Sequence, residues 1–177
     1  MKIKKLNYLT VVIGLTIIGA IIYSNSFDVP FQLDDDIQII DDGSGAYLDK
    51  YRDVSQWLSF YKYRPLSKLS LAMNYQIHQD HVFGYHLVNL IIHITASFIV
   101  FLFLMEILKS PVFRGRKYNM DPSVLAMFGA IVFLAHPIQT QSVTYIVQRM
   151  TSMAGLFYLL SCFLYLKSRY NYTLNKK

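Results

Sequence analysis

The chain has 177 residues, of which 54% are hydrophobic and only 16% are charged, and its mean hydropathy is +0.31. A soluble domain normally carries about 25% charged residues, and here the apolar residues gather in blocks near the length needed to cross a bilayer. The net charge of +6 could suit nucleic acid, but the basic residues flank the apolar blocks and form no continuous patch, which excludes nucleic acid as a partner.

The first apolar block covers residues 6–23 and follows a basic start in residues 1–5. A basic start before an apolar core also describes a signal peptide, which is the alternative here. The apolar run of about 18 residues is longer than most signal-peptide cores. We therefore predict a retained transmembrane helix.

Residues 24–84 form a long polar segment that is acidic overall. Its nine aspartates and five basic residues give a net charge of −4. Within it, two apolar stripes with helical spacing predict two short helices, which we expect to lie along the membrane interface; the alternative is a small soluble core. The first stripe is Val54, Trp57, Leu58 and Tyr61, and the second, after Pro65, is Leu66, Leu69, Met73 and Ile77.

Three further apolar blocks follow, at residues 85–108, from Pro122 to His136-Pro137, and at 149–167. The middle block has only about 14 residues, or about 21 Å of helix, whereas a bilayer core is about 30 Å thick. This helix should end early, kink at Pro137 or face a water-filled cavity. The sequence predicts an all-α integral membrane protein, with about four transmembrane helices in a single membrane domain over residues 1–177.

The basic residues indicate the orientation of the helices. They lie at the amino terminus, in residues 109–117 and at the carboxy terminus, and they alternate with the acidic segment and the His136 turn. Because basic loops stay on the cytoplasmic side, we predict that both termini are cytoplasmic. Residues 24–84 would then be the first extracytoplasmic loop of a multi-pass protein, in a bacterial inner membrane or, in a eukaryote, the endoplasmic reticulum membrane.

Asp34, Asp35 and Asp36 are adjacent in this loop. Neighbouring carboxylates repel one another, which raises the pKa of at least one of them unless a cation lies among them. A carboxylate with a raised pKa suits a general base, and a cluster of oxygens suits Mg²⁺, Mn²⁺ or Ca²⁺. A divalent metal ion is the only cofactor that the sequence suggests, and a solvated acidic turn is the alternative.

Polar residues inside the apolar blocks are candidates for lining a cavity. His86, Asn89 and His93 lie on one helical face, and His136 lies at the turn after the third block. Hydrogen bonding between helices is the alternative for this stripe. Arg64 and Arg149 are candidate phosphate-binding residues, because a guanidinium group can hold two phosphate oxygens; each could instead be an interfacial anchor.

Several motifs, in this order, resemble a known enzyme superfamily. They are SFDVPFQLDD at 26–35, YRPL at 63–66, GYHLVNL at 84–90 with His93, AHPIQT at 135–140, VTYIVQR at 143–149 and LFYLL at 156–160. Together they resemble membrane glycosyltransferases of the GT-C superfamily, and most closely the transmembrane O-mannosyltransferases with tetratricopeptide repeats and their bacterial relatives. The resemblance covers about residues 8–168, and it is to the amino-terminal part of those enzymes.

This resemblance implies a sugar donor linked to polyprenyl phosphate and an acceptor hydroxyl on the extracytoplasmic side. It assigns Asp34 and Asp35 as candidate catalytic residues and places Arg64 near the lipid phosphate. Many relatives have glutamate where this chain has Gln141. The family enzymes have about a dozen helices, often followed by helical repeats, so a missing carboxy-terminal membrane and repeat region is an expected partner.

Two other functions remain open from the sequence. The chain could be a non-catalytic membrane module, or a truncated remnant that assembles with a partner. It could also be a small transporter that uses the intramembrane histidines as a proton relay. The extracytoplasmic position of the aspartates favours glycosyl transfer over transport.

Overall fold

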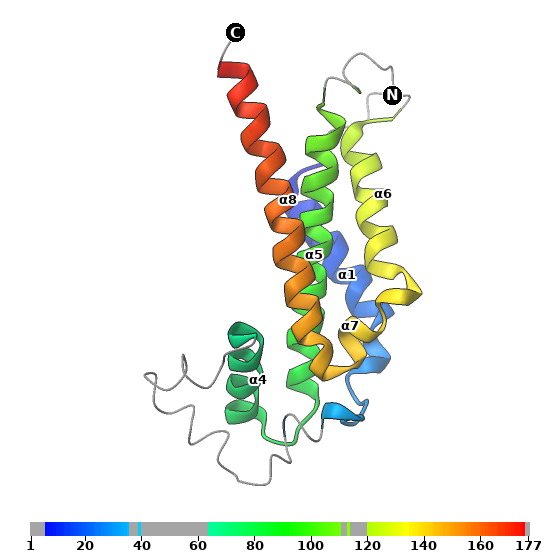
Figure 1. Cartoon of the computed structure of the whole chain (residues 1–177). Coiled ribbons are helices and arrows are strands. Elements are labelled where there is room, and N and C mark those ends of the chain that lie inside the picture. Colours follow the sequence, from blue (N-terminus) through cyan, green and yellow to red (C-terminus); the bar gives the residue numbers. More distant parts are fainter. Residues whose placement is uncertain (1–5, 36–38, 40–63, 111–112, 114–119, 176–177) are drawn as a thin grey trace. The chain divides into compact units, whose positions relative to one another are not determined.

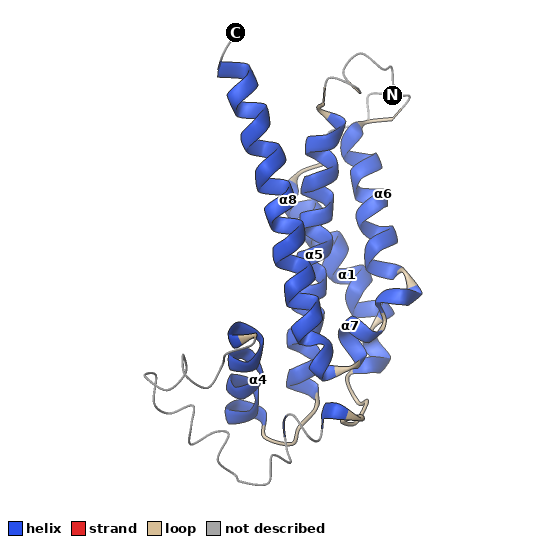
Figure 2. Cartoon of the chain, viewed as in Figure 1, coloured by secondary structure: helices blue, strands red, loops and turns tan. Residues whose placement is uncertain are grey.

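A computed structural model describes residues 6–35, 39, 64–110, 113 and 120–175 of the chain. All the elements within these ranges are helical (Figures 1 and 2). In chain order they are α1 (Tyr8–Ile22), η1 (Ser24–Ser26), α4 (Pro65–His78), α5 (Phe83–Leu108), α6 (Pro122–Ala135), η3 (Pro137–Gln139), α7 (Gln141–Thr144), η4 (Ile146–Gln148) and α8 (Arg149–Asn175). The predicted all-helical class is confirmed for this part of the chain.

Two helical segments are long and apolar enough to cross a membrane, namely Phe83–Leu108 and Ile146–Arg169. A third candidate exists if Pro122–Ala135 and Pro137–Thr144, which are separated by a sharp bend, count as one span. Helix α1 is apolar but has only 15 residues. By length and composition the described part of the chain therefore has two or up to three candidate spans, and the count of four stays a prediction.

The bounds of α6 follow from its local sequence. The side chain of Asp121 accepts a hydrogen bond from the backbone N–H of Ser123 at 2.7 Å, and Pro122 occupies the first helical turn. His136 precedes Pro137 and has an extended backbone, with φ −66° and ψ 130°. A residue before proline is disfavoured in the α region, which explains why the helix ends at Ala135. An early end was one of the three alternatives that the sequence left open.

The described chain divides into two compact units, each with its own core. Unit 1 comprises residues 1–22, 93–139 and 154–177, and unit 2 comprises residues 23–92 and 140–153. Compactness alone does not define a domain, so the single membrane domain over residues 1–177 stays a prediction.

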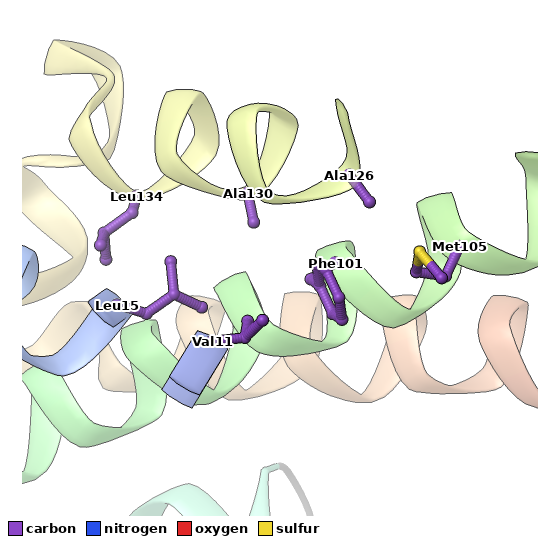
Figure 3. Close-up of a cluster of buried hydrophobic side chains, with 7 residues drawn as sticks. All are labelled: Val11, Leu15, Phe101, Met105, Ala126, Ala130 and Leu134. Atoms are coloured by element: carbon purple, nitrogen blue, oxygen red, sulfur yellow. The ribbon is translucent and has the colours of Figure 1, made fainter. Parts of the chain in front are cut away.

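Unit 1 is built on apolar packing between α1, α6 and the later turns of α5. Figure 3 shows its central side chains pointing into the space between these helices. Two alanines on α6 at i and i+4 present little bulk, which lets α1 approach closely. The buried core residues are Val11, Leu15, Phe101, Met105, Ala126, Ala130 and Leu134.

Unit 2 has a smaller core made by Leu71, Tyr85, Ile146 and Met150. Helices α4 and α5 meet closely here because Gly84 lacks a side chain: a Cβ at this position would lie 2.5 Å from the ring of His78. This close approach fixes the end of α4 beside the start of α5.

The short helices predicted in the acidic segment have different outcomes. The second is present as α4, which begins at Pro65 as its sequence indicated. The first, with its stripe Val54, Trp57, Leu58 and Tyr61, lies outside the described residues.

Candidate functional site

Asp34 and Asp35 lie in unit 2, and their side chains have opposite environments. Asp34 is exposed, and its backbone N–H lies 3.4 Å from the hydroxyl of Tyr145. Asp35 is fully buried. One of its carboxylate oxygens accepts the backbone N–H of Val147 at 2.7 Å, and the other accepts the backbone N–H of Gln32 at 3.0 Å. Asp35 therefore ties its own loop to residues 140–149, while the carboxylate of Asp34 faces outward.

Burial raises the pKa of Asp35 above the ordinary aspartate value, because a charged carboxylate loses its hydration there. The hydrogen bonds from Val147 and Gln32 lower this pKa, since they stabilise the charged carboxylate. The electrostatic effect of His86 also lowers it, by a smaller amount. The net result is a raised pKa.

His86, on the first turn of α5, is completely buried between two backbone segments. Its Nε2 lies 2.8 Å from the carbonyl oxygen of Val29, and its Nδ1 lies 3.0 Å from that of Val143. A neutral imidazole can donate to only one of these oxygens, whereas an imidazolium donates to both. Only the imidazolium can therefore hydrogen-bond the loop after α1 and residues 140–149 at the same time.

Arg149 and Asn89 are both fully buried in unit 2 and are hydrogen-bonded to each other. The Nε of Arg149 donates to Oδ1 of Asn89 at 2.7 Å, and the Nδ2 of Asn89 donates to the carbonyl of Ile146 at 3.3 Å. The remaining guanidinium nitrogens donate to the carbonyls of Ser70 at 3.1 Å and Tyr85 at 3.0 Å. Arg149 is fully buried, so its guanidinium links α4, α5 and the start of α8. A phosphate could reach it only after these hydrogen bonds break.

Arg64 is exposed and lies in unit 2. It lies directly before α4 and has a left-handed backbone with φ 58° and ψ 51°, which is strained for a residue that precedes proline. Among the described residues, the guanidinium Nη1 donates to the sulfur of Met150 at 3.7 Å. Of the two arginines predicted to bind phosphate, Arg64 is the one whose side chain is accessible.

The two other histidines predicted to line a cavity lie in unit 1. The Nε2 of His93 lies 3.1 Å from the carbonyl oxygen of Leu134, and His93 is buried. The Nδ1 of His136 accepts the backbone N–H of Ile138 at 3.2 Å, and His136 is exposed. His86 and Asn89 thus share contacts with residues 140–149, whereas His93 and His136 have separate partners.

The predicted metal site can be examined only in part. Asp36 lies outside the described residues. Within the ranges that the structure describes, no group of three or more His, Cys, Asp or Glu side chains could hold a metal ion. Both oxygens of Asp35 already accept backbone hydrogen bonds, so the metal ion stays a prediction.

The sequence did not indicate that Ser70 and the backbone of Val147 hold the candidate site residues in place. Ser70 accepts hydrogen bonds from Arg149 through its carbonyl and its hydroxyl, and Val147 holds Asp35 through its N–H. Every residue other than proline has the same backbone N–H and carbonyl groups, so the residue type does not show which of them will bind a side chain. The only available signal was the proximity of both residues to motifs that were already noted.

Curated protein sequences provide the comparison with known function. Human protein O-mannosyl-transferase TMTC4 is 28% identical over 165 residues, which are 85% of this chain and 22% of that protein. Human TMTC2 is 35% identical over 107 residues, 59% of this chain and 11% of that protein. The chain resembles protein O-mannosyl-transferases. This confirms the resemblance that the motifs indicated.

The same name is carried by a Caenorhabditis elegans relative, protein O-mannosyl-transferase F38B6.6, which is 27% identical over 118 residues. That match covers 67% of this chain and 16% of the relative. The chain therefore spans less than a quarter of the length of these relatives. No family model and no solved structure matches the chain.

Replacing Arg149 by lysine should destabilise the protein although the charge is kept. A lysine ammonium cannot reach Asn89, Ser70 and Tyr85 together, and each buried carbonyl left without a donor costs about 1–3 kcal/mol. We expect the free energy of unfolding to fall by about 2–4 kcal/mol, measured by denaturant titration in mixed micelles. Arg64→Lys is the matched control and should change it by less than about 0.5 kcal/mol. Equal effects of the two substitutions would refute the anchoring role of Arg149.

The raised pKa of Asp35 predicts a pH dependence of stability. The folded protein holds the Asp35 proton more tightly than the unfolded chain, whose aspartate titrates near about 3.9. The stabilisation is therefore complete below that pH and is lost as the pH rises through the higher folded-state pKa. The difference in the free energy of unfolding between the wild type and Asp35→Asn should therefore decrease as the pH rises from the unfolded-state pKa to the folded-state pKa, measured in a pH series. An increase with pH would show that the hydrogen bonds outweigh burial.

Proposed function

We propose that this chain forms part of a membrane glycosyltransferase. It would move a sugar from a polyprenyl-phosphate carrier to a hydroxyl acceptor on the extracytoplasmic side. The observation that carries the proposal is the pairing of an exposed carboxylate, Asp34, with a buried and anchored neighbour, Asp35. The names of the similar proteins, which are O-mannosyl-transferases, support the reaction class.

In this proposal Asp34 is the catalytic base. Its carboxylate takes the proton of the acceptor hydroxyl while the hydroxyl oxygen bonds to the anomeric carbon of the sugar. The bond between that carbon and the phosphate oxygen breaks, and the electron pair leaves with the polyprenyl phosphate. Asp34 suits this role because it is exposed while the next residue, held by two backbone hydrogen bonds, limits its movement.

Arg64 is proposed to hold the donor phosphate. Its guanidinium is exposed, and among the described residues it donates to the thioether sulfur of Met150. Because this sulfur is a weak acceptor, a phosphate could bind the guanidinium at the loss of only one weak hydrogen bond. Arg149 would act indirectly, because it fixes residues 140–149, to which Asp35 is bonded.

The proposal assumes the orientation of the chain in the membrane that the sequence predicted. Both termini would be cytoplasmic, and Asp34 would face the periplasm or, in a eukaryote, the lumen of the endoplasmic reticulum. The alternative of a non-catalytic module that assembles with a partner gains support from one observation. The matched stretch is less than a quarter of each similar protein, so further parts or a partner could complete the donor groove.

Substitution in native membranes tests the proposal, because any partner is present there. Asp34→Asn should lower transfer from a polyprenyl-phosphate sugar by about 10²- to 10⁴-fold, since asparagine cannot accept the proton. Asp80→Asn, which changes another exposed aspartate of unit 2, should keep a rate near wild type. The amount of inserted protein, measured by immunoblotting, should be unchanged in both. A wild-type rate for Asp34→Asn would rule out this carboxylate as the base.

A further inference from the structure

Helix α4 exposes an apolar stripe. Leu66, Met73 and Ile77 are 56%, 56% and 72% exposed, and their spacing of i, i+7 and i+11 places them on one face of the helix. We call these three residues the α4 apolar stripe. Three large apolar side chains exposed on one face of a 14-residue helix indicate a contact surface.

The inner side of α4, by contrast, buries polar residues. Ser67 and Asn74 are buried there beside Leu71, and the carbonyl and hydroxyl of Ser70 accept hydrogen bonds from buried Arg149. A surface helix of a soluble protein turns its apolar stripe inward and its polar face to water. Helix α4 buries Leu71 but exposes three other large apolar residues while it buries Ser67 and Asn74, which favours an apolar environment on its outer side.

We propose that the α4 apolar stripe contacts the acyl chains of the bilayer. Helix α4 is joined by only four residues, 79–82, to α5 (Figure 1), which is long and apolar enough to cross a membrane. The first turns of α5, in the same compact unit, expose Phe83, Leu87 and Ile91 at i, i+4 and i+8. The lipid-facing surface of α5 and the stripe of α4 thus belong to one unit.

The length of α4 limits how it can lie in the membrane. Its 14 residues span about 21 Å, less than the roughly 30 Å of a hydrocarbon core. The helix therefore lies in the interfacial layer with its stripe toward the acyl chains, and it does not cross.

This contact sets the depth of the carboxylates. Ser70 on α4 is bonded to Arg149, and Val147, two residues before Arg149, is bonded to Asp35. Only these short links separate the lipid-facing helix from the aspartate pair, so the carboxylates are held close to the membrane surface. The lipid contact does not depend on the proposed transferase activity.

Spin-label accessibility in liposomes tests the proposal. The only cysteine, Cys162, is first replaced by alanine, and single nitroxide labels are then attached to Met73→Cys and Ile77→Cys. Ile91→Cys on α5 is the lipid reference. Gln76→Cys is the matched control, because Gln76 is exposed on α4 but lies off the stripe. Power saturation measures the collision of each label with molecular oxygen, which concentrates in lipid, and with a water-soluble nickel chelate.

We expect labels at 73 and 77 to collide often with oxygen and rarely with the nickel chelate, as at 91, whereas the label at 76 meets the chelate several-fold more often. Nickel collision at 73 and 77 equal to that at 76 would place the stripe in water and overturn the proposal. Low collision with both reagents would show that protein covers the stripe, and would overturn it as well. Neither result bears on sugar transfer, which this experiment does not measure.

Discussion

The buried guanidinium of Arg149 is the interaction on which unit 2 depends. A cation removed from water is costly unless its donors are satisfied, and here carbonyl oxygens of Asn89, Ser70 and Tyr85 accept from all three of its nitrogens. Each acceptor comes from α4 or α5, while Arg149 begins α8. The need to satisfy one buried charge therefore holds three helices together around residues 140–149.

That arrangement explains the different environments of two neighbouring carboxylates. Residues 140–149 are fixed at one end by Arg149 and contacted by His86 through the carbonyl of Val143, so the N–H of Val147 has a defined position. Asp35 binds this N–H and is buried, which leaves Asp34 at the surface. A base that must meet an acceptor hydroxyl needs both access and a fixed backbone. Asp34 has the access, and its anchored neighbour supplies the rigidity.

Much of the fold could be predicted from the sequence, because apolar length and proline position are local signals. The block at 85–108 became α5 (Phe83–Leu108), and Pro137 ended α6. The site was predicted less well. Asp34 and Asp35 have the same chemistry, so only the tertiary contact with Val147 distinguishes them. Arg149 was a candidate phosphate-binding residue because of its guanidinium chemistry. In the structure acceptors distant in sequence surround it, and residue type carries no information about them.

The most direct test is a double-mutant cycle between Arg149 and Asn89, whose side chains are joined by a 2.7 Å hydrogen bond. The free energy of unfolding in mixed micelles is measured for the wild type, Arg149→Met, Asn89→Leu and the double variant. If Arg149 organises unit 2, the double variant should lose less stability than the sum of the single losses, with a coupling of about 1–3 kcal/mol. Additivity within about 0.5 kcal/mol would contradict the account.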